Sequence, residues 1–366
     1  MNILFDHQIF CLQQYGGISR YFYELARNLA DMPEQKVEIF APLYLNEYLS
    51  ARNGVGHHGI RISNLFGVAR VAAWGMDTAF AYPLLRRRRS VDIFHETYYS
   101  GIDCCPRSAK RIITVFDMIH EKFAESSPGR DKTRQAKAHA VRRADHVICI
   151  SENTRRDLVE LLGVPEDKIS VVYLGYSLTV REQRKSPLVD KPYILYVGER
   201  GGYKNFVSLL RVYAESAVLR DRFSLVCFGG GPFSSREREL MEAQGLSLSS
   251  VTHYSGGDDV LSGLYCAAAA FVYPSLYEGF GIPPLEAMSL GCPVVCSSSS
   301  SLPEAVGDAA EFFDPTDETE MRVAIERVVS SPARSRLLVD RGYERIKQFS
   351  WNRCAKETMQ VYAQQL

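Results

Sequence analysis

The chain has 366 residues, of which 46% are hydrophobic and 23% are charged. These are ordinary values for a globular protein, and the length exceeds what one hydrophobic core usually serves, so we expect two domains and exclude disordered and collagen-like classes. Lys and Arg total 43, and Asp and Glu also total 43, so the overall charge indicates neither a nucleic acid nor an acidic partner. No run approaches the roughly 20 apolar residues that span a bilayer.

The cysteines are odd in number and scattered, with no CxxC pair and no signal peptide ahead of them. This usage favours a reducing cytoplasm. Cys104 and Cys105, or Cys292 and Cys296, could be metal or redox pairs, but without nearby histidines such cysteines are more often buried small hydrophobes. We therefore expect no metal and no cofactor.

Short apolar runs rich in Val, Ile, Phe and Tyr alternate with amphipathic stretches of helix length, which is the pattern of parallel sheets built from βαβ units. A first series of predicted strands comprises Asn2–Phe5, Val37–Phe40, Val91–Phe94, Arg111–Val115, His146–Ile150 and Ser170–Tyr173. A second series comprises Tyr193–Val197, Phe223–Phe228, Val251–Tyr254, Ala270–Tyr273, Pro293–Cys296 and Glu311–Phe313. After the first strand, Ser19–Ala30 is predicted to be a helix with one apolar stripe, formed by Tyr21, Phe22, Leu25 and Leu29.

The polar stretch Ser177–Lys191 matches neither period and indicates a linker between the two series. The sequence therefore predicts an α/β protein with two Rossmann-like, doubly wound parallel-sheet domains, at residues 1–178 and 192–349. Such sheets bind ligands beyond the carboxyl ends of their strands, so two facing sheets predict one interdomain cleft.

Positive charge is concentrated in the first half of the chain. Between Arg86 and Arg143, 14 Lys and Arg residues stand against 7 Asp and Glu residues, and the segment includes the basic runs 86–89 and 130–143. This is either a solvated face or a surface that adheres to anionic lipid. The second alternative would suit an enzyme with a membrane-anchored acceptor, peripheral on the inner face of the cytoplasmic membrane.

The most informative segment is Pro274–Gly291, in which an apolar strand leads through a glycine-rich turn into a helix. Pro283 and Pro284 can occupy the helix start, where a missing N–H costs little. The amides of that first turn would offer donors and the positive end of the helix dipole to a diphosphate. Glu278 and Glu286, on either side of the turn, could accept hydrogen bonds from the hydroxyl pairs of a sugar and a ribose.

A second strand, turn and helix sequence, Leu195–Asn205, carries the two cations Arg200 and Lys204. A departing diphosphate needs fixed positive charge when no metal supplies it, and an Arg–Lys pair on a tight loop meets that need. The run Gly229-Gly-Gly-Pro232 also follows a strand, and it is either a plain tight turn or a direct contact of the nucleotide. Its spacing does not give the GxGxxG fingerprint of a dehydrogenase.

The two glutamates form a Glu-x7-Glu pattern that begins with Glu-Gly-Phe-Gly. This pattern resembles the signature of family-4 retaining glycosyltransferases of the GT-B fold. The similarity extends through the downstream Gly291-Cys-Pro-Val-Val and through Leu302–Ala310. It covers nearly the whole chain, is strongest from Tyr193 to Pro315, and is closest to bacterial mannosyltransferases of cell-surface polysaccharide assembly.

The resemblance implies a donor site in the second domain. Glu286 would hold the ribose hydroxyls, Glu278 would contact hydroxyls of the donor sugar, and Lys204 with Arg200 would stabilise the leaving diphosphate. Further donor-binding positions implied by the resemblance are Gly16, Gly17, Gly198, Gly230, Phe280, Gly281, Ile282 and Leu285. The chain departs from the family's pattern at Glu199, because the usual forms place an Arg directly after the glycine.

The resemblance also implies an acceptor side in the first domain. Gly16 and Gly17 resemble the glycine loop that comes close to the donor phosphate, and His95, at the end of a predicted strand, resembles the histidine that touches the transferred sugar. Asp117 and His120 complete the expected acceptor side, although this chain has Phe-Asp where the family often has His-Asp. A C-terminal helix at about 350–366 is expected to cross back to the first domain.

We therefore expect a retaining, metal-independent hexosyltransferase that uses a nucleotide-diphosphate sugar, with GDP-mannose or a GDP-deoxyhexose favoured over a UDP-hexose. The acceptor would be a hydroxyl of a glycan or glycolipid, and nucleic acid is not an expected partner. The alternatives are a GT-B epimerase or phosphorylase-like enzyme, and a sugar-nucleotide-binding membrane subunit without catalysis.

Overall fold

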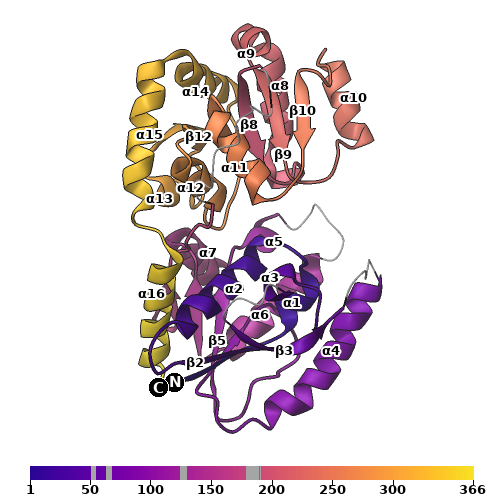
Figure 1. Cartoon of the computed structure of the whole chain (residues 1–366), viewed down its shortest axis with the longest axis vertical. Helices are drawn as coiled ribbons and strands as arrows, with labels where there is room; N and C mark the ends of the chain where they lie inside the picture. Colours follow the sequence, from indigo (N-terminus) through magenta and orange to yellow (C-terminus); the bar gives the residue numbers. More distant parts are fainter. Residues whose placement is uncertain (51–54, 63–67, 124–129, 179–188, 190) are drawn as a thin grey trace. The chain divides into compact units, whose positions relative to one another are not determined.

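The computed structural model describes residues 1–50, 55–62, 68–123, 130–178, 189 and 191–366 (Figure 1). The chain divides into two compact units. The first comprises Met1–Gly175 together with Ser350–Leu366, and the second comprises Tyr176–Phe349. Most of the predicted linker, at 179–188 and 190, lies outside the described residues.

The first unit is built on a seven-stranded sheet of order β3-β2-β1-β4-β5-β6-β7, in which all neighbouring strands run parallel. The strands are β1 (Asn2–Phe5), β2 (Lys36–Tyr44), β3 (Gly56–Arg61), β4 (Ile93–Glu96), β5 (Lys110–Val115), β6 (His146–Cys149) and β7 (Ile169–Val171). Six of them correspond to predicted strands. The sequence analysis missed the edge strand β3 because its mostly exposed residues, with two glycines and two histidines, show no apolar run.

Helices cover this sheet, and α2 begins at Gly17, two residues before the predicted start. Its stripe of Tyr21, Phe22, Leu25 and Leu29 is buried, as predicted. The C-terminal helix α16 packs against α2 within the same unit (Figure 1). The helices are α1 (Gln8–Leu12), α2 (Gly17–Ala30), α3 (Glu47–Ser50), α4 (Val68–Arg86), α5 (Ile119–Lys122), α6 (Arg130–Arg143), α7 (Glu152–Leu162), the 3-10 turn η2 (Glu166–Lys168) and α16 (Trp351–Gln364).

The second unit has a six-stranded parallel sheet of order β10-β9-β8-β11-β12-β13. The strands are β8 (Tyr193–Val197), β9 (Ser224–Phe228), β10 (Val251–Tyr254), β11 (Ala270–Tyr273), β12 (Val294–Ser297) and β13 (Ala310–Phe313). The helical segments are η3 (Gly202–Lys204), α8 (Phe206–Glu215), α9 (Ala217–Arg222), α10 (Ser235–Ala243), α11 (Asp258–Ala267), α12 (Ile282–Ser289), α13 (Leu302–Val306), α14 (Glu318–Ser330) and α15 (Pro332–Ile346). Buried residues of β8, β9, α8 and α14 form one continuous core.

The strand orders fix where each unit can bind a ligand. In the first unit the chain winds outward from β1 in one direction and from β4 in the other, and in the second unit β8 and β11 play the same parts. Doubly wound sheets bind ligands at such switch points, beyond the carboxyl ends of the strands. The predicted α/β class with two doubly wound parallel sheets is confirmed. Among the described residues, no helix combines the length and hydropathy needed to cross a membrane.

Candidate active site

A buried ion pair lies beyond the carboxyl ends of β8 and β11, at the switch point of the second unit. The Lys204 ammonium donates to Oε1 of Glu278 at 2.7 Å and to the hydroxyl of Tyr273 at 3.3 Å. The side chains of the pair are only 15% and 11% exposed. The structure therefore brings together two of the predicted site residues, which are 74 positions apart in the chain.

The loops that carry this pair are joined by hydrogen bonds of their own. The backbone N–H of Leu276, after β11, donates to the carbonyl of Tyr203, after β8, at 2.8 Å. The Asn205 amide donates to the carbonyls of Pro274 and Pro315, at 3.2 and 2.8 Å. Asn205 itself adopts a left-handed conformation, which asparagine tolerates better than most residues. These hydrogen bonds fix the two loops relative to each other.

Two serines after β12 hold the segment that carries Glu278. The Ser300 hydroxyl accepts a hydrogen bond from the Glu278 N–H at 2.9 Å. The Ser301 hydroxyl lies near the carbonyls of Glu278 and Phe280, at 2.8 and 2.9 Å, and is fully buried. Sequence analysis missed this function of Ser300 and Ser301. Their position soon after a predicted strand was the available signal, since strand ends carry the site in such sheets.

The turn that follows Glu278 leads into α12, which carries Glu286. Gly281 caps this helix with φ of 130°, and a Cβ there would approach the side chain of Leu302 to 3.0 Å, so the position requires glycine. Two prolines occupy the first turn and have no N–H, so the amides that can meet a phosphate there are those of Gly281 and Ile282. Glu286 is 7% exposed on the same helix.

The two apolar donor-binding predictions in this segment have buried side chains. Phe280 is 3% exposed and packs edge-on against Phe349, with ring centroids 5.6 Å apart. Leu285 is 0% exposed. These residues can therefore offer a donor their backbone but not their side chains in the structure described here.

The guanidinium of Arg200 is held by contacts within its own unit, and its expected part as a second phosphate cation stays a prediction. Its Nε donates to Glu237 at 2.6 Å, and its two terminal nitrogens donate to the carbonyls of Gly229, Gly231 and Pro232, at 2.9, 2.6 and 3.3 Å. The guanidinium also lies over the ring of Phe233, 4.9 Å from the centroid. Arg200 therefore ties the loop after β8 to the glycine turn after β9.

That glycine turn has the conformations expected of its sequence. Gly229 and Gly230 have φ of 85° and 64°, and a Cβ on Gly230 would come within 3.1 Å of the Arg200 guanidinium. Gly198, at the end of β8, has φ of 130° and donates its N–H to Phe228 at 2.9 Å. The backbone of these turns lies at the same sheet edge as Lys204 and Glu278, because all follow parallel strands.

His95 lies near the end of β4, inside the sheet of the first unit. It is within β4 rather than beyond it, is 0% exposed, and has both ring nitrogens bonded, to the Tyr362 hydroxyl at 2.6 Å and to the Thr114 hydroxyl at 2.9 Å. Burial lowers the pKa of His95 to about 3, so the ring is neutral. His95 thus joins β4 to β5 and to the C-terminal helix α16, and the expected contact with the transferred sugar stays a prediction.

The first residues beyond β1 and β4 form a buried polar cluster that sequence analysis missed. The Asp6 carboxylate accepts hydrogen bonds from the Thr97 N–H at 3.0 Å and from the Gln8 side-chain amide at 2.7 Å. The Ile9 N–H donates to the Thr97 hydroxyl at 3.2 Å. Asp6 thus fixes the two segments that border the switch point of the first unit.

The predicted acceptor-side residues lie at the start of α2 and around the short helix α5 in the first unit. Gly17 begins α2 and is exposed, and a Cβ there would meet nothing within 4 Å, whereas one on the adjacent Gly16 would collide with the Gln13 side chain. Asp117, in the loop that leads into α5, and His120, within α5, are both half-buried. The fully buried ammonium of Lys137 donates to the Asp117 carbonyl at 2.8 Å and anchors that loop.

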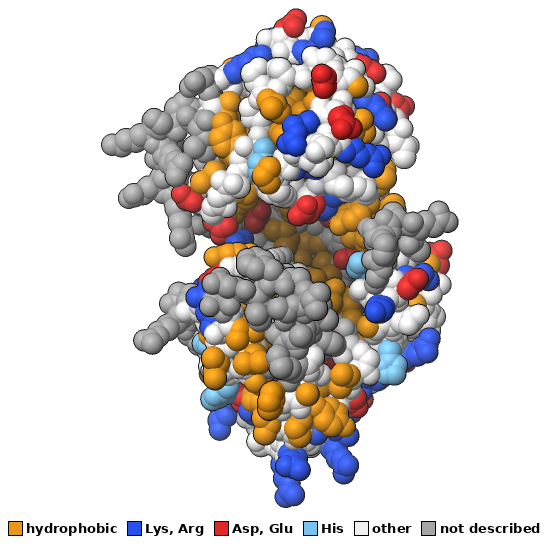
Figure 2. Space-filling view, turned by 90° about the vertical axis from the view of Figure 1, so that its right-hand side faces the viewer, with side chains coloured by type: hydrophobic (Ala, Val, Ile, Leu, Met, Phe, Trp, Pro, Cys, Tyr) orange, Lys and Arg blue, Asp and Glu red, His pale blue; other side chains and the backbone are white. Residues whose placement is uncertain are grey.

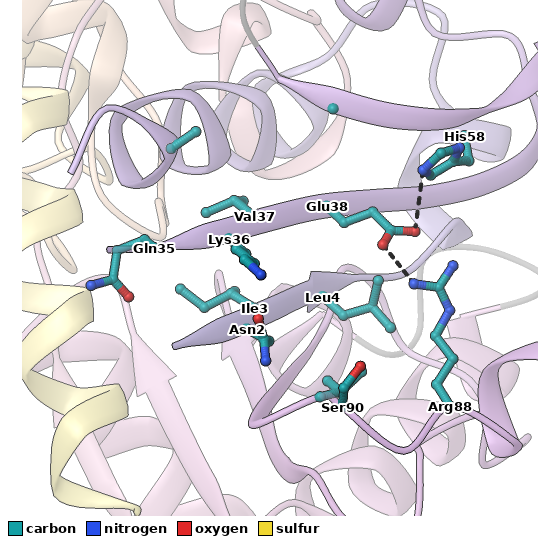
Figure 3. Close-up of a pocket in the computed structure, with 13 residues that line it drawn as sticks. Asn2, Ile3, Leu4, Gln35, Lys36, Val37, Glu38, His58, Arg88 and Ser90 are labelled. Carbon is teal, nitrogen blue, oxygen red and sulfur yellow. Dashed lines mark hydrogen bonds and ion pairs between the residues drawn. The ribbon is translucent and has the colours of Figure 1, made fainter. Parts of the chain in front are cut away.

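The close-up in Figure 3 shows a different cavity, of about 590 Å³, at the amino ends of the strands in the first unit. Its wall includes Asn2, Ile3 and Lys36, and at its rim Glu38 bonds Arg88 and faces His58. Ligands of doubly wound sheets bind at the opposite, carboxyl ends. This cavity is therefore not part of the candidate site. In the part of the chain that the structure describes, no three His, Cys, Asp or Glu side chains are grouped to hold a metal.

Comparison with known proteins assigns this architecture to a family. The family model described as Glycosyltransferase Family 4 matches residues 15–180, and the model described as Glycosyl transferases group 1 matches residues 180–345. O-antigen chain mannosyltransferase B of Escherichia coli is 29% identical over 367 residues, covering 94% of this chain and 95% of that protein.

Solved structures share the whole fold. Sucrose-phosphate synthase from Thermosynechococcus elongatus has a TM-score of 0.79 at 22% identity, covering 99% of this chain and 98% of that one. Anabaena HepE, in complex with UDP and glucose, has a TM-score of 0.75 at 15% identity, covering 99% of both chains. The two family models match consecutive stretches that together span residues 15–345. The chain therefore belongs to the family-4 glycosyltransferases of the GT-B fold.

Proposed function

We propose that this glycosyltransferase moves a hexose, mannose or a related deoxyhexose, from a nucleotide-diphosphate sugar to a hydroxyl of a glycan or lipid-linked acceptor. The product would belong to a cell-surface polysaccharide. The choice of sugar is supported by the similarity, over nearly the full length of both chains, to a protein named O-antigen chain mannosyltransferase B.

The observation that carries the proposal is the ion pair of Lys204 and Glu278 at the switch point of the second unit. A nucleotide-diphosphate sugar has an anionic diphosphate bonded directly to a ring with hydroxyl groups. One such ligand can therefore satisfy the ammonium with its phosphate and the carboxylate with its hydroxyls. Glu286 on α12 would then accept hydrogen bonds from the ribose.

We infer a front-face mechanism with retention of configuration and no metal. The bond between the anomeric carbon and the diphosphate oxygen breaks, and the acceptor oxygen bonds to the same face of the carbon. The acceptor proton passes to the leaving phosphate oxygen, so the protein need not supply a general base. Lys204 and the amides of Gly281 and Ile282 would stabilise the charge that grows on the diphosphate.

The donor nucleotide is tested by thermal shift with GDP-, UDP- and ADP-sugars. A donor present at 100 times its Kd stabilises the folded protein by about 2.7 kcal/mol, which is a readily measured shift. We expect GDP-mannose to give the largest shift. A shift with UDP-glucose alone would replace mannose by another hexose, and no shift with any sugar nucleotide would contradict the donor site.

Catalysis is tested by incubating the purified protein with labelled donor and a lipid extract, and then measuring the label in the lipid fraction. Lys204→Ala should lower kcat by roughly 100-fold, the scale of losing one preorganised charge, while EDTA should leave the wild type unchanged. Lys347→Ala, at an exposed lysine, is the matched control. A fully active Lys204→Ala would remove this lysine from the site, and strong inhibition by EDTA would overturn the metal-free mechanism.

We further propose that the enzyme works in the cytoplasm, at the surface of the membrane that would hold a lipid-linked acceptor. Transfer of label only to free sugar or to an epimerised donor would instead favour the epimerase or phosphorylase-like alternative. Donor binding without any turnover would favour a subunit without catalysis.

A further inference from the structure

The part of helix α4 from Thr78 to Leu85 is apolar on its exposed side as well as on most of its buried side. Ala81 and Leu85 are fully buried in a core cluster with residues of β1, β2 and β4. Phe80, Tyr82 and Leu84 are 64%, 43% and 54% exposed. A surface helix normally carries polar residues opposite its buried stripe, so this exposed apolar side is unusual for a helix that faces water.

The exposed side of the last two turns has no charged residue from Ala79 to Leu84. Figure 2 faces the side of the molecule on which α4 lies in Figure 1, and it shows hydrophobic side chains gathered on the surface of the first unit. Contiguous exposed apolar side chains of this kind mark interaction sites for proteins or membranes.

The four arginines that follow this apolar segment divide into two pairs. Arg86 donates to the Cys105 carbonyl at 3.0 Å, and Arg88 pairs with Glu38 at 2.5 Å, so these two fasten the end of α4 to its own unit. Arg87 and Arg89 have exposed side chains and no ion-pair partner among the described residues. Two outward cations thus adjoin the exposed apolar residues.

The second basic stretch, α6, lacks this combination. Lys137 is fully buried against Glu121, and Arg143 pairs with the buried Glu96 at 2.7 Å. The exposed residues between Asp131 and Arg142 are polar or charged. Of the two basic runs that sequence analysis considered for lipid contact, 130–143 therefore contributes structural ion pairs and no apolar surface.

We propose that the exposed residues Phe80, Tyr82, Pro83, Leu84, Arg87 and Arg89, the α4 outer surface, dock on an anionic lipid bilayer. Apolar and aromatic side chains enter the boundary between headgroups and acyl chains, and adjacent arginines attract anionic headgroups. A second copy of the chain is a poorer occupant, because a symmetric contact would place the same arginines against each other. The inference rests on the proposed function in one respect: contact with the bilayer would bring the enzyme to its lipid-linked acceptor.

The test is co-sedimentation of the full chain with vesicles of phosphatidylcholine, with and without one quarter phosphatidylglycerol, at 0.1 M NaCl. We expect binding to the anionic vesicles that weakens in 0.5 M NaCl, since salt screens exposed charges. Removing one cation should lower the partition constant about fivefold, so Arg87→Gln with Arg89→Gln should lower it by more than tenfold. Phe80→Ser with Leu84→Ser should lower it to a similar extent.

The matched control is Lys132→Gln with Arg142→Gln, which removes the same charge from the exposed part of α6. It should change the partition constant by less than twofold. All substituted residues are exposed, so the melting temperature should stay unchanged, and transfer of sugar to a water-soluble acceptor should also persist in the α4 variants. If no transfer occurs with any variant or with the wild type, the proposed function fails while the vesicle result stands.

Three results would overturn the proposal. One is binding that does not depend on lipid charge or salt, and another is a loss in the α6 control as large as in the α4 variants. The third is the absence of vesicle binding together with a dimer in analytical ultracentrifugation that the double variant Phe80→Ser with Leu84→Ser dissociates. That result would assign the surface to a second copy of the chain.

Discussion

Replacing Arg200 by lysine separates two functions that a cation in this loop could have. A phosphate cation works through its charge, which lysine keeps. A residue that holds the glycine turn works through the planar fork of the guanidinium, which lysine lacks. The structure shows the second arrangement, with hydrogen bonds to Glu237 and to three carbonyls of Gly229–Pro232.

The size of the effect follows from these contacts. A lysine ammonium can keep the pair with Glu237 but cannot also span the turn, so at least two charged hydrogen bonds are lost, each worth about 1.5 to 3 kcal/mol. Water can replace part of this because Gly229 and Gly230 are half-buried and Gly231 and Pro232 are exposed. We therefore expect a net loss of about 2 to 3 kcal/mol, which for a unit of this size lowers the melting temperature by about 5 to 10 °C.

The assay is calorimetric binding of a nucleoside and of its diphosphate to Arg200→Lys, to Glu237→Gln and to the wild type. A misplaced turn should lower the affinity for both ligands by a similar factor, about 30-fold if some 2 kcal/mol of binding free energy is lost. Glu237→Gln should also lower both affinities by one common factor, but by a smaller one. Arg211→Lys, at an exposed ion pair, is the control. Weaker binding of the diphosphate alone, with an unchanged melting temperature, would refute the reasoning and restore Arg200 as a phosphate cation.

Three further predictions concern individual contacts. Glu286→Ala should weaken the binding of free nucleotide by about 1.5 to 3 kcal/mol, measured by calorimetry. An unchanged affinity would contradict the assignment of Glu286 to the ribose. Ser301→Ala should lower kcat by a larger factor than it raises the donor Kd, because it loosens the backbone of Glu278 but removes no ligand contact. A kcat equal to that of the wild type would exclude a positioning function of Ser301. His95 has a pKa of about 3 when folded and about 6.5 when unfolded, so the unfolded chain binds the extra proton and stability falls as the pH drops below about 6.5, by up to about 1.4 kcal/mol per unit. His95→Gln, measured by urea unfolding between pH 7 and 4.5, should show a shallower fall than the wild type, and parallel curves would contradict this cause.

The sequence predicted the parts of the site that depend on strand ends. Lys204 and Glu278 each follow an apolar run by a few residues, and parallel strands bring their carboxyl ends to one edge, so their proximity was foreseeable. The prolines and glycine at the start of α12 gave the turn geometry locally, because those residues restrict the backbone by themselves.

Other features depended on contacts between distant segments. Nothing local to Arg200 indicates that Glu237, 37 positions later, would neutralise it. Ser301 contacts Glu278 because β11 and β12 are neighbours, which periodicity alone does not specify. His95 lies inside the sheet because β4 continues to Glu96, whereas the predicted strand ended at Phe94. A difference of two residues at a strand end decides whether a side chain lies inside the layer or beyond it.

The most direct test of the proposed reaction is proton NMR of transfer from GDP-mannose to a synthetic lipid-linked acceptor by the purified full chain. The donor is α-configured, so retention predicts an anomeric signal of an α-mannoside that grows as the donor signal declines, with no β-mannoside at any time. A β-mannoside as the first product would contradict the front-face mechanism. Loss of donor without any mannoside would contradict glycosyl transfer itself.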